Sequence, residues 1–144
     1  MKYKLLIISA LAYILAVACK KETREIEPPY NLRCNYVLKG TIFNSDLVVL
    51  ENIEVKLYEI TPDSPSKSSL RDKAISDENG FYEVKNMSTI PYIYNTYRLH
   101  FSDLNHNYKD TVVTVIFTNE NFTGGNGDKF LGDAVWEFNV FLSI

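Results

Sequence analysis

A two-residue period of hydrophobicity limits what this chain can fold into more than any other feature. It is clearest near the C-terminus, where apolar side chains alternate with polar ones: Trp136, Phe138, Val140 and Leu142 against Glu137, Asn139 and Ser143. Residues 53–57 and 97–101 repeat the alternation. Successive side chains of a strand point to opposite faces of a sheet, so each segment is predicted to bury one face and expose the other. No helical period follows Ala18.

Further β-branched and aromatic runs lie at residues 36–43, 81–85 and 112–117, and a short one lies at 74–76. A chain of 144 residues with 46% hydrophobic and 23% charged residues has the composition of an ordinary globular protein, and its length fits one compact domain. Six or seven short strands separated by turns therefore predict an all-β protein, a single β-sandwich.

Two segments carry strong turn signals. Residues 61–69 are polar and contain two prolines, which predicts a loop. Residues 76–80 predict a tight turn, because Asn79 and Gly80 readily take positive φ. The flanking runs are accordingly predicted to form a hairpin.

The N-terminus predicts a signal peptide over residues 1–18. Lys2 and Lys4 precede an apolar run of 14 residues, 5–18, which is too short to cross a hydrocarbon core about 30 Å thick. Small side chains end the run, and cleavage is expected between Ala18 and Cys19. Residues 15–19 resemble the lipobox of bacterial lipoproteins, which implies that Cys19 carries a diacylglycerol anchor. The alternative is an ordinary secretory signal.

Residues 19–33 predict a flexible, lipidated tether, because charges alternate in sign and Pro28 and Pro29 follow. Residues 20–33 would reach at most about 45 Å. Lys20 after the lipidated cysteine resembles lipoproteins sorted to the outer membrane, so we expect a bacterial cell-envelope location, with the periplasmic or surface side left open. Loss of residues 1–18 moves the net charge from −3 to −5, which argues against nucleic acid as a partner.

The remaining cysteine, Cys34, opens the domain predicted over residues 34–144. With Cys19 acylated it has no partner for a disulfide. We expect it to be buried, because free cysteine is among the most buried residue types. The alternative is a reactive or intermolecularly paired thiol.

Three segments carry a resemblance to a known family: residues 38–41, 53–57 and 76–82 are similar to the G-x-V, I-x-V-x-L and T-D-x-x-G-x-Y pattern of carboxypeptidase-regulatory-like and transthyretin-like domains. The resemblance implies a Greek-key sandwich of about seven strands. The signal, the tether, residues 103–110 and the terminal W-x-F-x-V-x-L segment also resemble the Bacteroidetes lipoproteins named for their association with radical-SAM enzymes. Neither resemblance implies enzymatic activity.

Residues 103–110 are a candidate calcium site. Asp103, Asn105, Asn107 and Asp110 present side-chain oxygens at short spacing, and calcium binds six to eight oxygens. The alternative is a turn in which these side chains bind their own backbone. No other cofactor is expected.

The segment from residue 119 to 133 is a candidate ligand loop. Its polar members are Asn119, Glu120, Asn121, Asn126, Asp128 and Asp133, and its glycines would let the backbone approach a ligand closely. The alternative is a long connection between strands. Tyr92, Tyr94 and Tyr97 form a second candidate, a platform for sugar or peptide, unless they belong to the core.

Catalysis is not predicted. His100 and His106 are the two side chains that could act as a general base near neutral pH, and neither lies in a catalytic motif. The sequence therefore predicts a monomeric, lipid-anchored binding or accessory module for an envelope protein, a peptide or a glycan. The alternative is a structural or adhesive subunit related to Bacteroidetes fimbrial proteins, whose edge strands add to neighbours.

Overall fold

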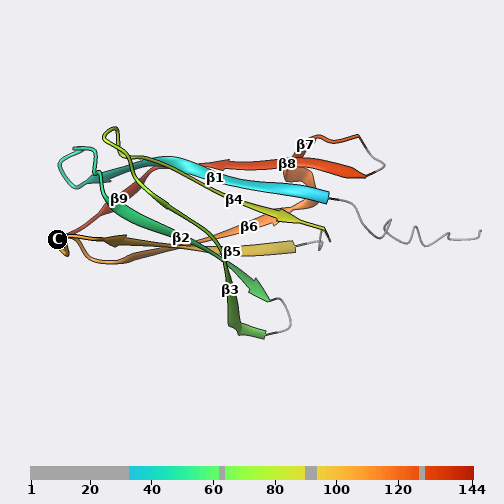
Figure 1. The fold of residues 1–144 in the computed structure, drawn as a ribbon, viewed down its shortest axis with the longest axis horizontal. Coiled ribbons are helices and arrows are strands. Elements are labelled where there is room, and N and C mark those ends of the chain that lie inside the picture. Colours follow the sequence, from blue (N-terminus) through green and yellow to red (C-terminus); the bar gives the residue numbers. More distant parts are fainter. Residues whose placement is uncertain (1–32, 62–63, 90–93, 127–128) are drawn as a thin grey trace, which may run out of the picture.

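The computed structural model describes residues 33–144 except 62–63, 90–93 and 127–128, so the predicted signal peptide, Ala18, Cys19, Tyr92 and Asp128 lie outside it. The described residues form two β-sheets packed as a sandwich (Figure 1), which confirms the all-β prediction. The one helical element described is a 3₁₀ turn, η1, at Asn119–Asn121. No helix among the described residues is long and apolar enough to cross a membrane.

The strands divide between the two sheets as follows. The first sheet has the order β4-β1-β8-β7, and β9 also pairs with β1; the second has the order β3-β2-β5-β6. Their bounds are β1 Arg33–Asn44, β2 Ile53–Thr61, β3 Ser64–Ile75, β4 Phe81–Ser88, β5 Tyr94–Asp103, β6 Thr111–Thr118, β7 Phe122–Gly124, β8 Phe130–Glu137 and β9 Val140–Leu142. The described residues thus hold nine strands where about seven were expected, and two of the nine have only three residues.

The C-terminal alternation is divided between two strands. Both β8 and β9 run parallel to β1, and Phe138 between them donates its N–H to the Lys39 carbonyl at 3.0 Å. The break between β8 and β9 lies beside Gly40, where a Cβ atom would lie 1.8 Å from the Phe138 carbonyl oxygen. Val140 and Leu142 are buried, as the alternation predicts. Trp136, predicted on the same buried face, is instead 39% exposed and contacts the core through Phe117.

Aromatic side chains fill the space between the sheets. Tyr36 packs against Tyr97 and Phe117 at ring-centroid distances of 4.9 and 5.1 Å, in tilted and edge-on geometry. The Asn95 amide donates to the Tyr36 hydroxyl, and the Asn86 amide donates to the Tyr97 hydroxyl at 2.8 Å. Burial is the main cause that raises the pKa of both tyrosines. Tyr97 is fully buried, so it belongs to the core, the alternative to the tyrosine platform.

The turn at residues 76–80 forms but does not close a hairpin. The Asp77 carboxylate accepts N–H bonds from Asn79 and Phe81, and Gly80 has φ 70°. The flanking strands nevertheless belong to different sheets, because β3 pairs with β2 and β4 with β1. Turn chemistry fixes the local reversal of the chain. The buried side chains of β4 must be covered by another layer of the protein, and β3, whose side chains are almost all exposed, does not provide that layer.

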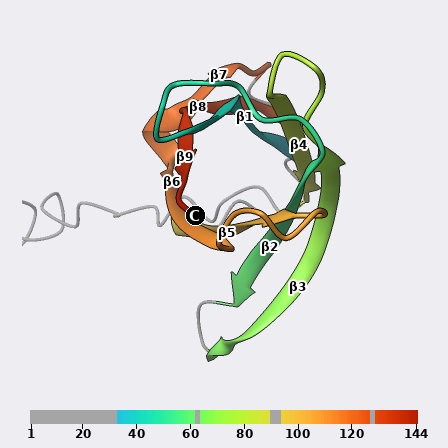
Figure 2. The same ribbon diagram turned by 90° about the vertical axis from the view of Figure 1, so that its left-hand side faces the viewer.

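β3 replaces the loop predicted over residues 61–69. It has 12 residues and pairs with β2 over most of its length, yet almost all of its side chains are exposed. Seen end-on, the β2–β3 pair extends away from the body of the sandwich (Figure 2). Backbone hydrogen bonds hold such an edge strand, so it carries no apolar period for the sequence to reveal.

Cys34 is fully buried, as predicted. Its thiol donates to the Ser88 carbonyl at 3.7 Å, and burial raises the pKa of the thiol. β1 begins at Arg33, one residue before the predicted domain boundary.

Candidate functional site

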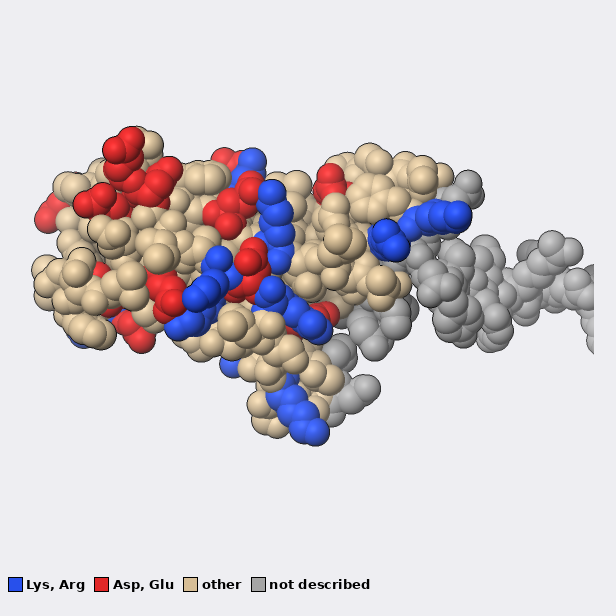
Figure 3. Space-filling model, viewed as in Figure 1, with Lys and Arg blue, Asp and Glu red and all other residues tan. Residues whose placement is uncertain are grey.

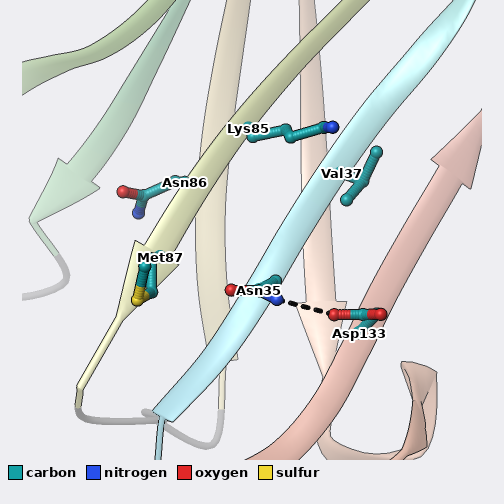
Figure 4. A pocket seen from close by; sticks show the side chains of 6 residues that line it. All are labelled: Asn35, Val37, Lys85, Asn86, Met87 and Asp133. Carbon is teal, nitrogen blue, oxygen red and sulfur yellow. Dashed lines mark hydrogen bonds between the residues drawn. The ribbon is translucent and has the colours of Figure 1, made fainter.

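A hollow of about 320 Å³ lies on the outer face of the first sheet (Figure 4). Strands β1, β4 and β8 supply its lining. The six lining residues are Asn35, Val37, Lys85, Asn86, Met87 and Asp133.

The strand period and the register together build this hollow. Cys34, Tyr36 and Leu38 point into the core, so Asn35 and Val37 between them point outward. Asn35 is paired with Met87 on β4 and with Asp133 on β8, which places the three in one row across the sheet.

The hollow combines a carboxylate, an amide and an ammonium group. The Asn35 amide donates to Asp133 Oδ1 at 2.8 Å, while Asp133 Oδ2 has no hydrogen-bond partner among the described residues. Lys85 extends over β1 and pairs with Glu83 at 2.6 Å, and this ion pair raises the pKa of Lys85. Met87 and Val37 add apolar surface. Such a set suits a ligand that offers hydroxyl or amide donors, and it contains no nucleophile poised beside a base.

The charges of the surface are unevenly distributed. Figure 3 shows acidic side chains gathered toward the end with the turns that follow β1 and β3, and Lys and Arg side chains across the middle of that face. The acidic residues in those two turns, Asp46, Glu51, Asp77 and Glu78, are all exposed. The hollow lies toward the other end, where β1 begins.

The structure separates the residues of the predicted ligand loop. Asp133 faces the hollow, whereas Asn121 and Asn126 hold the local backbone: Asn121 Oδ1 accepts the Thr118 N–H, and Asn126 Oδ1 accepts the Phe130 N–H. Glu120 is exposed in η1, which begins at Asn119. Sequence reasoning missed Asn35, Lys85 and Met87. The alternation of inward and outward side chains along β1 and β4 could have indicated that these residues face outward. That they lie side by side depends on the register between the strands, which the sequence does not give.

The candidate calcium residues lie around one turn, after β5. Asp103 is buried, and its two oxygens accept N–H bonds from Asn105, Asn107 and Tyr108 at 2.9, 2.7 and 3.2 Å. This is the backbone-binding arrangement considered as the alternative. Asp110 is exposed further along. Among the described residues no three His, Cys, Asp or Glu side chains lie close enough together to hold a metal ion. Calcium binding by the side-chain oxygens of Asp103, Asn105, Asn107 and Asp110 stays a prediction.

The two histidines lie apart from the hollow. His100 is on the outer face of the second sheet, where its ring lies 4.9 Å from that of Tyr58. Partial burial, and then the nearby Arg98, lower its pKa. His106 has φ 58° in the turn after β5.

No protein-family model and no curated protein matches the chain. Among solved structures, chlorocatechol 1,2-dioxygenase from Pseudomonas putida is similar at a TM-score of 0.53 and 11% identity, over 78% of this chain and 61% of that one. A 3-chlorocatechol 1,2-dioxygenase from Rhodococcus opacus is similar at a TM-score of 0.50 and 10% identity, over 76% and 59%. A streptococcal ancillary pilin is similar at a TM-score of 0.45 and 17% identity, over 76% and 32%.

The chain spans about 60% of the two dioxygenase chains. At this identity, the likeness to the dioxygenases shows the fold alone.

Proposed function

We propose that the protein is a lipid-anchored, non-catalytic binding module of the bacterial cell envelope. The apolar run and the small residues before Cys19 support the anchor. The envelope location, on the outer membrane, follows from that anchor and from Lys20.

The observation that carries a binding role is the hollow around Asp133. The Asp133 carboxylate has one oxygen with no hydrogen-bond partner among the described residues, and it lies beside the Asn35 amide and the charged Lys85. Side chains with spare hydrogen-bonding capacity next to exposed apolar groups are what an extended peptide or a glycan would contact. We propose a ligand of that class.

The anchor is tested in a bacterial host with the full-length chain. Cys19→Ser should move the protein from the membrane fraction to the soluble fraction and abolish the acyl mass expected on the N-terminal peptide. Cys34→Ser is the control, and it should leave the protein in the membrane. Wild-type protein with an unmodified Cys19 would overturn the anchor.

The hollow is tested by screening the detergent-purified lipoprotein on glycan and peptide arrays. A genuine ligand of the hollow should lose at least about tenfold in affinity with Asp133→Ala, about 1.4 kcal/mol. Asp46→Ala, which also removes an exposed carboxylate, should not change the affinity. Equal losses in both variants, or no binding by the wild type, would contradict the assignment.

A structural subunit remains the second candidate. The observation that favours it is the uncovered edge of β6, which lies in the other sheet from the hollow.

A further inference from the structure

The strands at the edges of the two sheets, β3, β4, β6, β7 and the three-residue β9, are protected to very different degrees. β3 carries Pro65 and several charges, and β7 has only three residues and ends in Gly124. The N–H of Lys85 on β4 donates to the Asp72 carboxylate of β3 at 2.7 Å. Charge, proline, glycine, short length and side-chain capping are the features that keep a free edge from pairing with another chain.

β6 lacks these features over residues 111–117; at its last residue, Asn121 Oδ1 accepts the Thr118 N–H. Its eight residues, TVVTVIFT, are uncharged and mostly β-branched. In the described part of the chain, β6 pairs with β5 alone, and no backbone hydrogen bond joins residues 111–117 to any other element. Val112 and Ile116 are 51% and 54% exposed on its outer face. An edge with this composition is a template for strand addition.

We propose that β6 pairs with β6 of a second copy of this chain, antiparallel about Thr114, and joins the two β3-β2-β5-β6 sheets into one. A charged edge would oppose its own copy with like charges, whereas β6 brings no charge to such a pair. The pair would cover residues 111–117 of both copies.

The charges that flank β6 select the register. A two-fold axis through Thr114 places Val112 opposite Ile116 of the second copy, and Asp110 opposite Thr118. An axis through Val115 would instead oppose Asp110 and Glu120, which repel one another.

The predicted tether is long enough for this arrangement. Reversing β6 also reverses β1, so the two tethers leave opposite ends of the pair. β1 has 12 residues and spans about 40 Å, while residues 20–33 reach at most about 45 Å. Both anchors can therefore enter the same membrane, where confinement raises the effective concentration of the two copies. This step rests on the proposed lipidation of Cys19, whereas the open edge does not. The pairing replaces the monomer expected from the sequence.

Association is tested on the detergent-purified full-length chain by analytical ultracentrifugation across a concentration series. Val112→Lys combined with Ile116→Lys places lysines opposite one another across the pair, and should raise the dimer dissociation constant at least tenfold. The matched control is Leu70→Lys combined with Ile75→Lys on β3, because those side chains are 52% and 56% exposed on the other edge of the same sheet. The control should dimerise like the wild type, and thermal melts should show that both variants are folded.

The register is tested in native membranes by mild oxidation. Thr114→Cys should give a disulfide-linked homodimer, while Ser68→Cys on β3 should give none. A wild-type chain that stays monomeric at 200 μM, or equal weakening by the two lysine pairs, would overturn the pairing. A dimer that Thr114→Cys does not cross-link would overturn the Thr114 register. The ultracentrifugation outcomes depend neither on ligand binding by the hollow nor on acylation of Cys19, whereas the cross-link in membranes rests on the proposed anchor.

Discussion

Replacing Gly40 with alanine tests how closely the first sheet is packed where β8 passes into β9. The added Cβ would lie 1.8 Å from the Phe138 carbonyl oxygen and 2.7 Å from its carbonyl carbon, far inside van der Waals contact. Both are backbone atoms, so no side-chain rotation can relieve the clash. Gly40 itself has an ordinary strand conformation with φ outside the positive region, and the space is therefore the whole obstacle.

The expected cost follows from what must move. Overpacking costs about 1 to 3 kcal/mol, and a backbone obstacle favours the upper end. Displacement of residue 138 strains two hydrogen bonds, Phe138 N–H to the Lys39 carbonyl at 3.0 Å and the Tyr82 hydroxyl to the Phe138 carbonyl at 3.3 Å, worth about 1 kcal/mol each at most. Alanine regains about 0.5 to 1 kcal/mol because it restricts the unfolded chain more than glycine does. The net loss is about 3 kcal/mol.

The measurement is urea unfolding together with a thermal melt. A loss of about 3 kcal/mol should lower Tm by roughly 10 °C for a domain of this size. Gly124→Ala is the control: no atom lies within 4 Å of its Cβ position, and its φ of 75° should cost only about 1 kcal/mol. A Gly40→Ala protein that melts within about 3 °C of the wild type would show that the close crossing of β1 and Phe138 is wrong.

Three further predictions concern buried or partly buried side chains. Ser76→Ala should lower the free energy of unfolding measured in urea by about 2 kcal/mol. The buried Ser76 hydroxyl donates to the Leu50 carbonyl at 2.7 Å and accepts the Ile53 N–H at 3.0 Å, and alanine loses both bonds. Ser69→Ala, at an exposed position, should cost almost nothing. The pKa of His100 is lowered in the fold, so the unfolded chain binds more protons than the folded chain just below pH 6.5. Part of the stability present above that pH should therefore be lost as the pH falls. His100→Gln should flatten this pH dependence of the free energy of unfolding. The buried Cys34 thiol, whose pKa is raised, should react with a thiol reagent at pH 8 far more slowly in the native protein than in urea, and equal rates would contradict its burial.

The sequence predicted the secondary structure best where a strand has one buried face. Val55, Leu57, Leu99 and Phe101 alternate with polar residues and lie in the core, because burial imposes the period of two on the sequence. β3 was not predicted as a strand for the same reason. It buries no side chain completely, and its pairing with β2 depends on backbone groups that every residue carries.

The candidate site was predictable only in part. Asp133 stands out in the sequence as a polar residue near a glycine-rich stretch. Its neighbours in the hollow, Asn35 and Met87, lie 98 and 46 positions away, and only the pairing of β1 with β8 and β4 brings them into one row. Asp103 shows a different limit, since its spacing to Asn105 and Asn107 fits a metal loop and a backbone-capping turn equally well.

The alternation of side chains determined that most of this chain forms strands, and the hydrophobic faces of those alternating strands determined that they pack as a sandwich. The order of the strands was decided only in the tertiary structure. A turn such as residues 76–80 reverses the chain whether the next strand joins the same sheet or the opposite one, and the choice depends on which face still needs to be covered. Which edges remain open, including that of β6, follows from the same choice, because a backbone edge is free only when no distant strand pairs with it.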